Sequence, residues 1–505
     1  MVIAIGVVLG QAEMPGPGER RFIQAIADDP RFDLKILAAG PASPGAPRNP
    51  VAAALHLEAR AFSAPDVAPT DLPGIVPLAD AAPAGCDVVV DFSHSDAALE
   101  FGSSVGEGVW RLSAFAPGAG LAQARDRAPF TQVTLIRHRD GEGAQPISTA
   151  RYDTKFLATR NAALIQEKSV QMITQALARL ALTGSAMGVA DPHPVPRPFA
   201  SRDLAGYFLR TAGELTVRAL NAAGERLGRR PGMFELRLGH GDGLTFDPAA
   251  GVTLAPPAGT FWADPFMFEH DGALFLFYEV YDYKTRLGHL DVGRIEGDTL
   301  VPLGTALKRP YHLSYPFVFS WNDEIWMIPE THTAERLEIW RATDFPTGWE
   351  LAATAFEGAS VADTVLFQQG GQWWMFTNIC HDSFTDHGTE LHLFRVDSPM
   401  LREIEPHPLN PVVIDTTTAR GGGRVFARDG KLYRTSQDNS HGTYGFGLNL
   451  MEITRLDETG YEEHRVRHVV GDFSEGIMAC HHMDAAAGRF VIDVRRRALG
   501  GPKLR

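Results

Sequence analysis

Four carboxylates in the last 245 residues of the chain stand at repeated positions: Asp264, Glu279, Glu330 and Asp363. Carboxylates gathered around one opening are costly to leave unpaired, because like charges raise one another's pKa and burial disfavours the ionised form. Such clusters more often serve catalysis, or the binding of a cation or sugar, than stability. These four residues are therefore the candidate catalytic groups.

The pattern that places them recurs five times. Each copy is a two-residue turn followed by an apolar or aromatic run, and the second turn residues are 272, 323, 371, 430 and 488, in steps of 51, 48, 59 and 58 residues. Repeats near 50 residues with this turn-and-strand chemistry predict a five-bladed β-propeller, here over residues 230–497. The copies are Asp271–Phe277, Asn322–Ile328, Gly370–Phe376, Asp429–Arg434 and Ala487–Ile492.

Equivalent positions of successive blades form rings about the axis of a propeller, because the innermost strands line one central channel. Eight residues before the second turn residue stand Asp264, Tyr315, Asp363, Gly422 and Cys480. Seven residues after it stand Glu279, Glu330, Asn378, Gln437 and Arg495. The repeat therefore predicts that the four carboxylates lie in two neighbouring rings.

Five further residues are candidate substrate-binding groups: Trp262, Tyr315, Arg424, Gln437 and His481. Sugar faces stack on aromatic rings, while polar side chains bind sugar hydroxyls. A guanidinium beside glycines matches an anionic sugar or phosphate, although a surface turn explains the same residues. No metal site is expected, since adjacent histidines on a strand point to opposite faces.

The composition sets the class of protein. With 505 residues, 44% apolar and 21% charged, the chain is expected to be soluble and to fold as two or three domains. A net charge of −14 argues against nucleic acid or an anionic membrane as a partner. The apolar start lacks a basic signal-peptide region, no stretch reads as a membrane span, and three scattered cysteines favour a reducing cytoplasm.

Residues 1–182 alternate strand and helix signals, which predicts an α/β domain with a parallel sheet. The turn after the first strand, Gly10–Gly18, does not fit G-x-G-x-x-G, so a dinucleotide site is not expected. Asp91–Asp96 follows a later strand and is a competing site, although Ser93 and Asp96 suit helix capping better. Residues 183–229 form a proline-rich linker and a connecting helix.

The end of this domain resembles the second half of the sugar and methionyl-tRNA formyltransferase catalytic domain. The likeness rests on Val133–Leu135, the acidic turn Asp140–Gly143, an Ile-containing strand and one long helix over Asn161–Leu182. It implies Asn, His and Asp side chains around 10-formyltetrahydrofolate. Gly108–Ser113 holds neither Asn nor His, and only Asp140 matches the acid, so the resemblance implies a degenerate domain and leaves the cofactor unassigned.

The propeller resembles the five-bladed glycoside hydrolase clan of arabinanases, xylosidases and fructosidases. It is more specifically similar to the amino-terminal domain of plant glucosamine inositolphosphorylceramide transferases and their bacterial relatives. In the hydrolases a first-blade Asp is the base or nucleophile, a second-blade Asp tunes, and a later Glu is the acid. Asp264 matches the first role, and Tyr315 stands where the second Asp is expected. The resemblance then leaves Asp363 to supply the electrostatic tuning, and Glu279 or Glu330 to act as the acid. The motifs are Trp262–Phe266, Tyr315–Phe317, Ala362–Thr364, Trp326–Glu330, Gly421–Phe426 and Tyr433–Asp438.

We therefore expect a transferase-like enzyme of surface glycan, polysaccharide or glycolipid biosynthesis, with a sugar held in the propeller channel. A glycoside hydrolase using Asp264 with Glu279 or Glu330 is the first alternative. A noncatalytic glycan-binding scaffold is the second. The sequence leaves open the sugar, the donor, the oligomeric state and whether hydrolysis would retain or invert.

Overall fold

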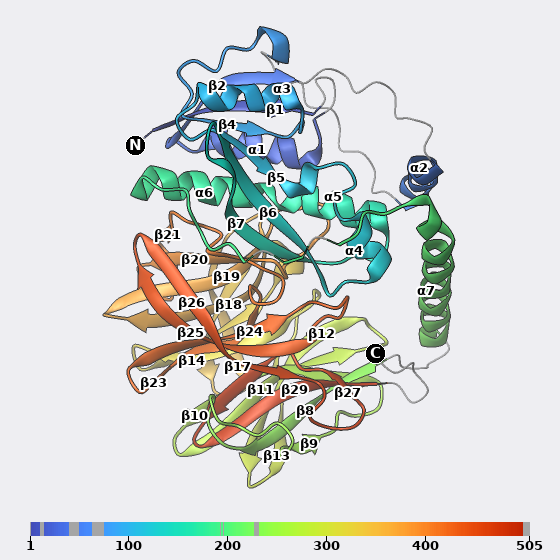
Figure 1. Ribbon diagram of the computed structural model, residues 1–505. Helices are drawn as coiled ribbons and strands as arrows, with labels where there is room; N and C mark the ends of the chain where they lie inside the picture. The colour runs from blue at the N-terminus through green and yellow to red at the C-terminus, as the bar shows by residue number, and fades with distance from the viewer. Residues whose placement is uncertain are drawn as a thin grey trace. The chain divides into compact units, whose positions relative to one another are not determined.

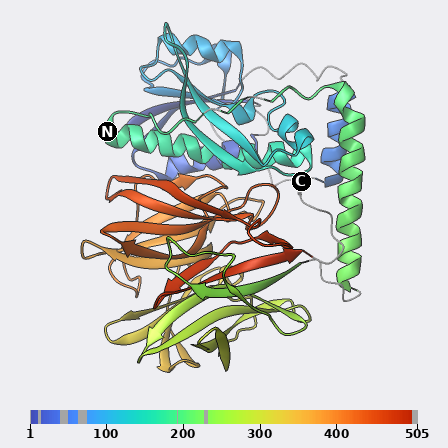
Figure 2. The same cartoon turned by 60° about the horizontal axis from the view of Figure 1, so that its bottom comes forward.

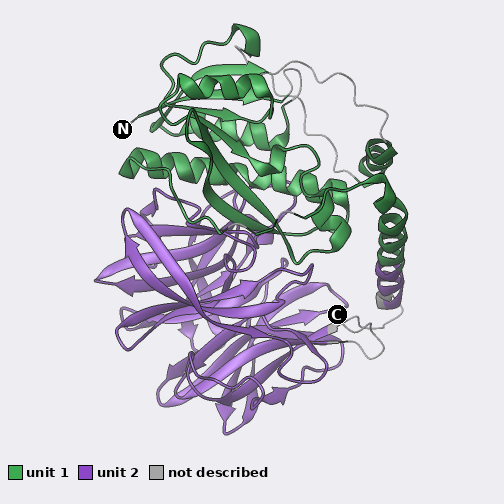
Figure 3. Cartoon of the chain, viewed as in Figure 1, with its two compact units in different colours: residues 1–216 green, residues 217–505 purple. Residues whose placement is uncertain are grey.

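The computed structural model describes residues 2–10, 15–39, 50–62, 75–191, 193–194, 196–226 and 232–497. The chain divides into two compact units, residues 1–216 and 217–505 (Figure 3). The predicted succession of an α/β domain and a five-bladed propeller is confirmed. The boundary between the units falls inside helix α7 (Leu204–Arg226), within the segment predicted as a joint.

Unit 1 is built on a seven-stranded sheet in the order β3-β2-β1-β4-β5-β6-β7 (Figure 1). Neighbours from β3 to β5 pair in parallel, while β6 is antiparallel to both β5 and β7. The strands are β1 (Ile3–Leu9), β2 (Phe32–Ala39), β3 (Val76–Pro77), β4 (Val88–Asp91), β5 (Val109–Leu112), β6 (Phe130–Arg139) and β7 (Gly143–Asp153). The continuous apolar runs of β1 and β4 are buried, as expected of strands covered on both faces.

Helices cover this sheet. α1 contacts α5 and α6, whereas α3 belongs to a separate apolar cluster with Val8, Val89 and Val109. The helices of unit 1 are α1 (Pro17–Asp28), α2 (Pro50–Phe62), α3 (Asp96–Leu99), α4 (Leu121–Asp126), α5 (Ala158–Lys168) and α6 (Val170–Thr183), with 3₁₀ turns η1 (Leu78–Asp80), η2 (Glu100–Ser103), η3 (Ser113–Phe115) and η4 (Ser201–Asp203).

One long helix was predicted over residues 161–182, and that prediction was wrong. The segment forms two helices, α5 and α6, which meet at Ser169. The ψ of Ser169 is −14°, well away from the value of about −42° that continues an α-helix. Among the described residues, no helix has both the length and the apolarity needed to cross a membrane.

Unit 2 is the propeller, with five antiparallel sheets arranged as blades (Figure 2). Blade 1 is β10 (Thr260–His270), β11 (Ala273–Asp282), β12 (Leu287–Glu296) and β13 (Thr299–Leu307); blade 2 is β14 (Ser314–Trp321), β15 (Glu324–Glu330), β16 (Leu337–Asp344) and β17 (Gly348–Ala355). Blade 3 is β18 (Ser360–Gln369), β19 (Gln372–Cys380), β20 (Glu390–Val396), β21 (Ile404–Pro406) and β22 (Val413–Ile414). Blade 4 is β23 (Gly421–Arg428), β24 (Lys431–Asp438), β25 (Gly447–Asp457) and β26 (Gly460–Val470), and η5 (His332–Ala334) lies in blade 2.

Blade 5 joins the two ends of the propeller segment. Its inner strands are β27 (Ile477–Ala479), β28 (Met483–Ala486) and β29 (Arg489–Arg497), and its outer strands are β8 (Gly232–His240) and β9 (Val252–Leu254). β29 pairs with β8 over nine residue pairs, from Arg489 with His240 to Arg497 with Gly232. The first strand of the unit therefore closes the ring against the last.

The five recurring turns are the hairpins between the first and second strands of the blades. In every copy both turn residues have positive φ, between 49° and 81°. Positive φ at both central residues defines the type I′ turn, whose twist matches that of the strands it joins. The Asp-Gly, Asn-Asp, Gly-Gly and Ala-Gly pairs of the sequence thus fix the register from which the channel residues are counted.

Candidate functional site

The first predicted ring is created by a shared distortion of the innermost strands. Asp264, Tyr315 and Asp363 have φ of 48°, 49° and 53°, and each sits in a register shift between the first two strands of its blade. A bulge of this kind re-aims one side chain. Blade 4 carries a longer shift, between Gly421 and Val425.

The second ring lies opposite the first across the same hairpins. Ala263 pairs with Glu279, Ser314 with Glu330, Ala362 with Asn378, and Ala479 with Arg495. In blade 4, Gly421 pairs with Ser436, so Gln437 is offset by one residue. The positions counted from the sequence thus agree with the strand register in blades 1, 2, 3 and 5. In blade 4 the glycine bulge displaces the count by one residue.

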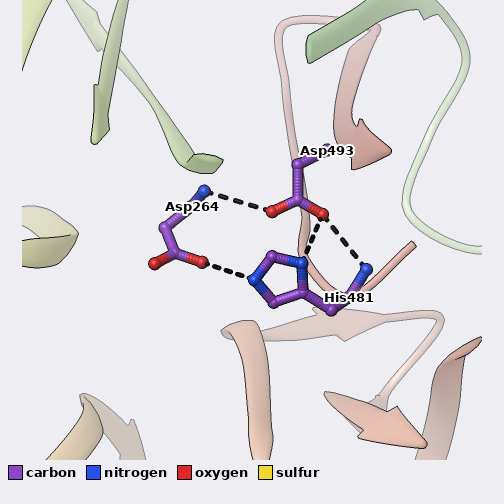
Figure 4. A group of neighbouring side chains, drawn as sticks. All are labelled: Asp264, His481 and Asp493. Atoms are coloured by element: carbon purple, nitrogen blue, oxygen red, sulfur yellow. Dashed lines mark hydrogen bonds and ion pairs between the residues drawn. The ribbon is translucent and has the colours of Figure 1, made fainter. Parts of the chain in front are cut away.

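Asp264 belongs to a buried chain of three side chains that also includes His481 and Asp493 (Figure 4). Nε2 of His481 lies 3.1 Å from Oδ1 of Asp264, and Nδ1 lies 3.0 Å from Oδ1 of Asp493. Asp493 also accepts backbone hydrogen bonds from Asp264 at 3.2 Å, His481 at 3.1 Å and His482 at 2.9 Å. One carboxylate therefore ties the first strand of blade 1 to the start of blade 5.

The imidazole between these carboxylates is a cation. Burial alone would lower its pKa, but the charges of Asp493 and Asp264 outweigh burial and raise the pKa of His481 to about 10. Burial opposes ionisation of Asp493, whose pKa is nevertheless lowered by His481. The three groups are close enough to share a metal ion. Because both imidazole nitrogens already face a carboxylate, we interpret them as an ion-paired chain.

Glu330 and Asp363 face a second cation, Arg420. Nε of Arg420 lies 2.6 Å from Oδ2 of Asp363, and its Nη2 lies 3.5 Å from Oε2 of Glu330. Nδ1 of His332 lies 2.7 Å from the other oxygen of Glu330. Oε2 of Glu330 is buried without a hydrogen-bond donor among the described residues.

The pKa values of Asp363 and Glu330 are shifted in opposite directions. Burial raises the pKa of Asp363, and the charge of Glu330 raises it further despite Arg420. Burial also opposes ionisation of Glu330, but the hydrogen bond with His332 and the charge of Arg420 lower its pKa. These directions favour an ionised Glu330 beside a protonated Asp363.

Glu279 is the least compensated carboxyl of the set. It is 5% exposed, and its neighbour His312 lies 3.6 Å away through Nε2. Nδ1 of His312 accepts a hydrogen bond from the backbone N–H of Gly288, and burial lowers the pKa of this histidine. Burial, then the charges of Asp264 and Glu330, raise the pKa of Glu279 well above its usual range. The protonated form of Glu279, which can donate a hydrogen bond, is therefore favoured more than in an ordinary glutamate.

Tyr315 crosses the channel. Its hydroxyl donates to the carbonyl of Gly423 at 3.1 Å and accepts from the N–H of the same residue at 3.0 Å. Its ring contacts Phe266 of blade 1 and His482 of blade 5, with centroids 4.9 and 5.1 Å apart. Tyr315 is fully buried, so it fills the channel axis at the level of the carboxylates.

The structure places the other substrate-binding candidates in supporting roles. Arg424 pairs with Asp484 at 2.6 Å and donates to the carbonyl of Met267. Gln437 donates to the carbonyl of Gly421 at 2.7 Å. Trp262 packs against Tyr278 in the apolar cluster shared with β8 and β29. Of these candidates, only His481 and Tyr315 are in the carboxylate cluster itself.

Three imidazoles and one tyrosine lie near the cluster: His332, His387 and Tyr444 follow the second strands of blades 2, 3 and 4, and His312 lies in the loop between blades 1 and 2. The ring of His332 lies 6.2 Å from His312 and 5.5 Å from His387. Burial, followed by the charge of Arg420, lowers the pKa of His387 to about 4. Tyr444 is 41% exposed, and its ring lies beside both Arg420 and His481. The accessible rim thus offers an aromatic face above buried acids.

Unit 1 has a smaller polar cluster at the carboxyl ends of β4 and β5. Arg111 donates to Asp91 at 2.7 Å, and Ser93 donates to the same carboxylate at 2.6 Å. Ser95 accepts from the N–H of Ala98 and caps α3, the role that the sequence assigned to Ser93 and Asp96. Asp91 is thus a structural anchor of this edge.

The described residues at that edge form no phosphate site, and the matched formyltransferase acid lies elsewhere. Glu19 accepts hydrogen bonds from the N–H groups of Gly10 and Gly16, so a carboxylate occupies the start of α1. Asp140 follows His138, which pairs with Val109 at the amino end of β5. The single family-matching acid is therefore at the opposite end of the sheet from Asp91.

Sequence reasoning did not select Asp493 or His312 as site residues, and it considered Arg420, like Arg424, only as a contact for an anionic sugar or phosphate or as part of a surface turn. Asp493 had a visible signal, since it is a single charge in the apolar run Phe490–Val494. Arg420 stands next to the glycine run that the sequence singled out, but its partners come from blades 2 and 3. His312 lies in a linking loop with no repeat position. The local sequence held no signal for side chains that pair with residues of another blade.

Comparison with known proteins places the propeller. Residues 248–488 match the family described as glucosamine inositolphosphorylceramide transferase 1, N-terminal. The transferase of that name from Oryza sativa subsp. japonica is 37% identical over 238 residues, 45% of this chain and 31% of that protein. The Arabidopsis thaliana protein is 32% identical over 244 residues, 46% of this chain and 31% of that protein. The match thus spans about a third of the length of these relatives.

Among solved structures, the alpha-L-arabinofuranosidase from Lactobacillus brevis aligns with 46% of this chain and 82% of its own, at 13% identity and a TM-score of 0.34. A likeness this distant says nothing about activity. The sequence matches are more informative, and they cover the blades that carry Asp264, Glu279, Glu330 and Asp363. The propeller of this chain is therefore similar to the amino-terminal region of plant glucosamine inositolphosphorylceramide transferases, as its motifs predicted.

Proposed function

We propose that the propeller holds the sugar group of a carbohydrate or glycolipid at the carboxylate end of its channel, and that the chain acts in transfer reactions of glycan assembly. The observation that carries this proposal is a buried set of five carboxyl groups, among which the described residues place the Arg420 guanidinium and the His481 imidazole. Sequence similarity to proteins named as glucosamine inositolphosphorylceramide transferases supports the class of substrate and of reaction.

The chemistry of this end of the channel suits sugar hydroxyls. An ionised carboxylate accepts hydrogen bonds from hydroxyl groups, while a protonated carboxyl, the form that burial favours at Glu279, can donate one. The exposed ring of Tyr444 offers a face on which a sugar ring can stack. Because Tyr315 is buried and joins blades 2 and 4 within the cluster, we expect the ligand to approach from the side on which Tyr444 is exposed.

Transfer is favoured over hydrolysis by the state of Asp264. One oxygen of this carboxylate faces the His481 imidazole at 3.1 Å, so that oxygen is occupied by an ion pair and is not open to a sugar. The hydrolytic alternative has one supporting observation: burial, and then the charge of nearby Asp264, raise the pKa of Glu279, which favours its protonated form. One protonated and one ionised carboxyl are what glycoside cleavage requires.

Formyl transfer forms no part of this proposal. In unit 1, Asp140 lies at the amino end of β5, away from the ligand edge expected of a parallel sheet. A cytoplasmic location remains a prediction from the cysteine pattern.

A ligand screen on the full chain tests the proposal. Oligosaccharides, nucleotide sugars and 10-formyltetrahydrofolate are compared by thermal shift, because a ligand at a hundred times its dissociation constant stabilises by about 2.7 kcal/mol. Stabilisation by sugars, weakened in Asp264→Asn but not in the exposed turn variant Asp271→Asn, is the expected result. Stabilisation by folate alone, or by no sugar, contradicts the proposal.

The same variants separate the alternatives with any ligand found. Asp264→Asn that binds sugar but no longer releases product supports hydrolysis. Unchanged product release rules out Asp264 as the hydrolytic group. Sugar binding without turnover, with or without a nucleotide sugar, supports the noncatalytic scaffold.

A further inference from the structure

We propose that Glu330 and Asp363 share one proton beneath Arg420, and that Arg420 is the positioning residue that makes this pair an acid–base unit. The inference deepens the proposed function at the same site, although the sharing of a proton does not depend on any ligand. It begins with geometry: one guanidinium lies within 4 Å of both carboxyls, 2.6 Å from Asp363 and 3.5 Å from Glu330.

The unpaired oxygen of Glu330 points to the same arrangement. Glu330 is 7% exposed, and its Oε2 has no hydrogen-bond donor among the described groups if both carboxyls are ionised. A buried acceptor of this kind is costly to leave unmatched. Glu330 and Asp363 lie against the same guanidinium and shift each other's pKa, so a proton on Asp363 can supply the missing donor to Glu330.

The balance of charge also favours one shared proton. Arg420 can compensate one of the two carboxylates, and the His481 cation is already placed between Asp264 and Asp493. Two buried carboxylates in contact cannot both remain ionised without a second cation, as in carboxyl pairs that titrate together. One neutral and one ionised carboxyl match the single positive charge of Arg420.

The surroundings of the pair supply no second fixed cation in the described part of the propeller. Asp264, Glu279 and Asp493 are acids, while burial lowers the pKa of His312 and His387. Nδ1 of His332 faces Glu330. The groups that face the pair or its neighbours are Asp264, Glu279, His312, His332, His387, Arg420, Tyr444, His481 and Asp493.

A pair of carboxyls that holds one proton can donate that proton and accept another while Arg420 stays in place. When the leaving oxygen of a glycosyl donor accepts the proton as its bond to the anomeric carbon breaks, both carboxyls become ionised, and Arg420 stabilises the added charge. A hydroxyl of the incoming acceptor, or water, gives its proton back to the pair as its oxygen bonds to the same anomeric carbon, and the leaving group of the donor departs with the first proton. The net proton count of the pair is then unchanged over one transfer.

Infrared spectroscopy of the full chain measures this proton directly. Protonated carboxyls absorb separately from carboxylates, and Glu279→Gln removes the contribution of Glu279. In that background we expect a remaining protonated-carboxyl band at pH 7. Adding either Asp363→Asn or Glu330→Gln is expected to abolish the band, because the lone partner ionises beside Arg420.

The possible results separate clearly. No band in Glu279→Gln, or a band that persists in either double variant, overturns proton sharing. Circular dichroism confirms that each variant folds. Failure of the sugar screen would leave this spectroscopic result unaffected, so the two proposals fail independently.

Arg420 is tested through the titration of the band. Arg420→Gln should move its midpoint upward by about 1–3 pH units, the effect of losing a nearby opposite charge. Arg420→Lys keeps the positive charge, so its midpoint should lie close to that of the wild type. Arg424→Lys is the matched control, since Arg424 pairs with Asp484 at the other end of the same glycine run. An unchanged midpoint in Arg420→Gln contradicts the positioning role.

Discussion

The hydroxyl of Tyr315 and the backbone of Gly423 exchange two hydrogen bonds across the centre of the propeller, one in each direction. Blade 2 is thereby joined to blade 4 without a covalent link. The resemblance to glycoside hydrolases placed an acid at the position of Tyr315, and the structure shows what the tyrosine does instead. It fills the channel and holds the blades in place.

Tyr315→Phe is expected to destabilise the propeller by about 1–3 kcal/mol, because the N–H and C=O of Gly423 become buried without partners. The ring remains, so the channel stays filled. Equilibrium unfolding in urea measures the change. Tyr315→Ala, which also removes the ring, should cost more, and equal costs for the two variants would show that the hydroxyl contributes little.

Gly423→Ala should be more damaging than Gly430→Ala. A Cβ on Gly423 would lie 2.0 Å from the carbonyl oxygen of Met483, and φ is +142°. Gly430 also has positive φ, +76°, but nothing lies within 4 Å of its Cβ position. The control should therefore cost about 1–2 kcal/mol, the usual penalty for a left-handed residue. Similar unfolding midpoints for the two variants would contradict the close approach of β23 to β28.

His481 should stabilise the fold in a pH-dependent way. Its pKa is raised to about 10 in the folded chain, above the unfolded value of about 6.5. The contribution is therefore fully present below pH 6.5 and is lost as the pH rises to 10. Unfolding free energies of wild type and His481→Gln should differ most near pH 6 and converge towards pH 10. A difference that grows over this interval would mean that the imidazole is buried neutral.

Glu279 should also make stability fall as the pH rises, over a more acidic range than His481. Because its pKa is raised in the folded state, the folded chain binds more protons than the unfolded one above about pH 4.5, and stability falls as pH rises. Glu279→Gln keeps a neutral side chain of the same shape, so we expect the variant to gain stability over wild type between pH 5 and 8. The exposed Glu357→Gln is the control and should show no such trend.

Local patterns predicted the blades because the residues of each hairpin determine its turn without help from the rest of the chain. Turn pairs such as Asp271-Gly272 set both the end of one strand and the start of the next, and the ring positions follow by counting. The count was offset at Gln437 because the glycine bulge of blade 4 adds a residue. A bulge depends on what approaches the strand, here Met483 and Asp363, and not on the strand alone.

Partners from distant segments could not be predicted in the same way. Asp493 meets Asp264 across 229 residues, and Arg420 meets Asp363 across 57. β8 and β9 lack the repeated turn, so nothing in residues 232–254 indicated that they complete blade 5. The charge state of the site follows from these long-range pairs, which is why the candidate acids were predicted but their partners were not.

The pairing of β8 with β29 also has a consequence for synthesis of the chain. β8 emerges from the ribosome first, and its partner strand, Arg489–Arg497, is made more than 240 residues later. At about 5–20 residues per second, the edge of β8 waits on the order of 10–50 s for its neighbour. During that interval its backbone donors and acceptors are open to pairing with another strand. The propeller thus becomes a closed body only when translation has delivered its final strand.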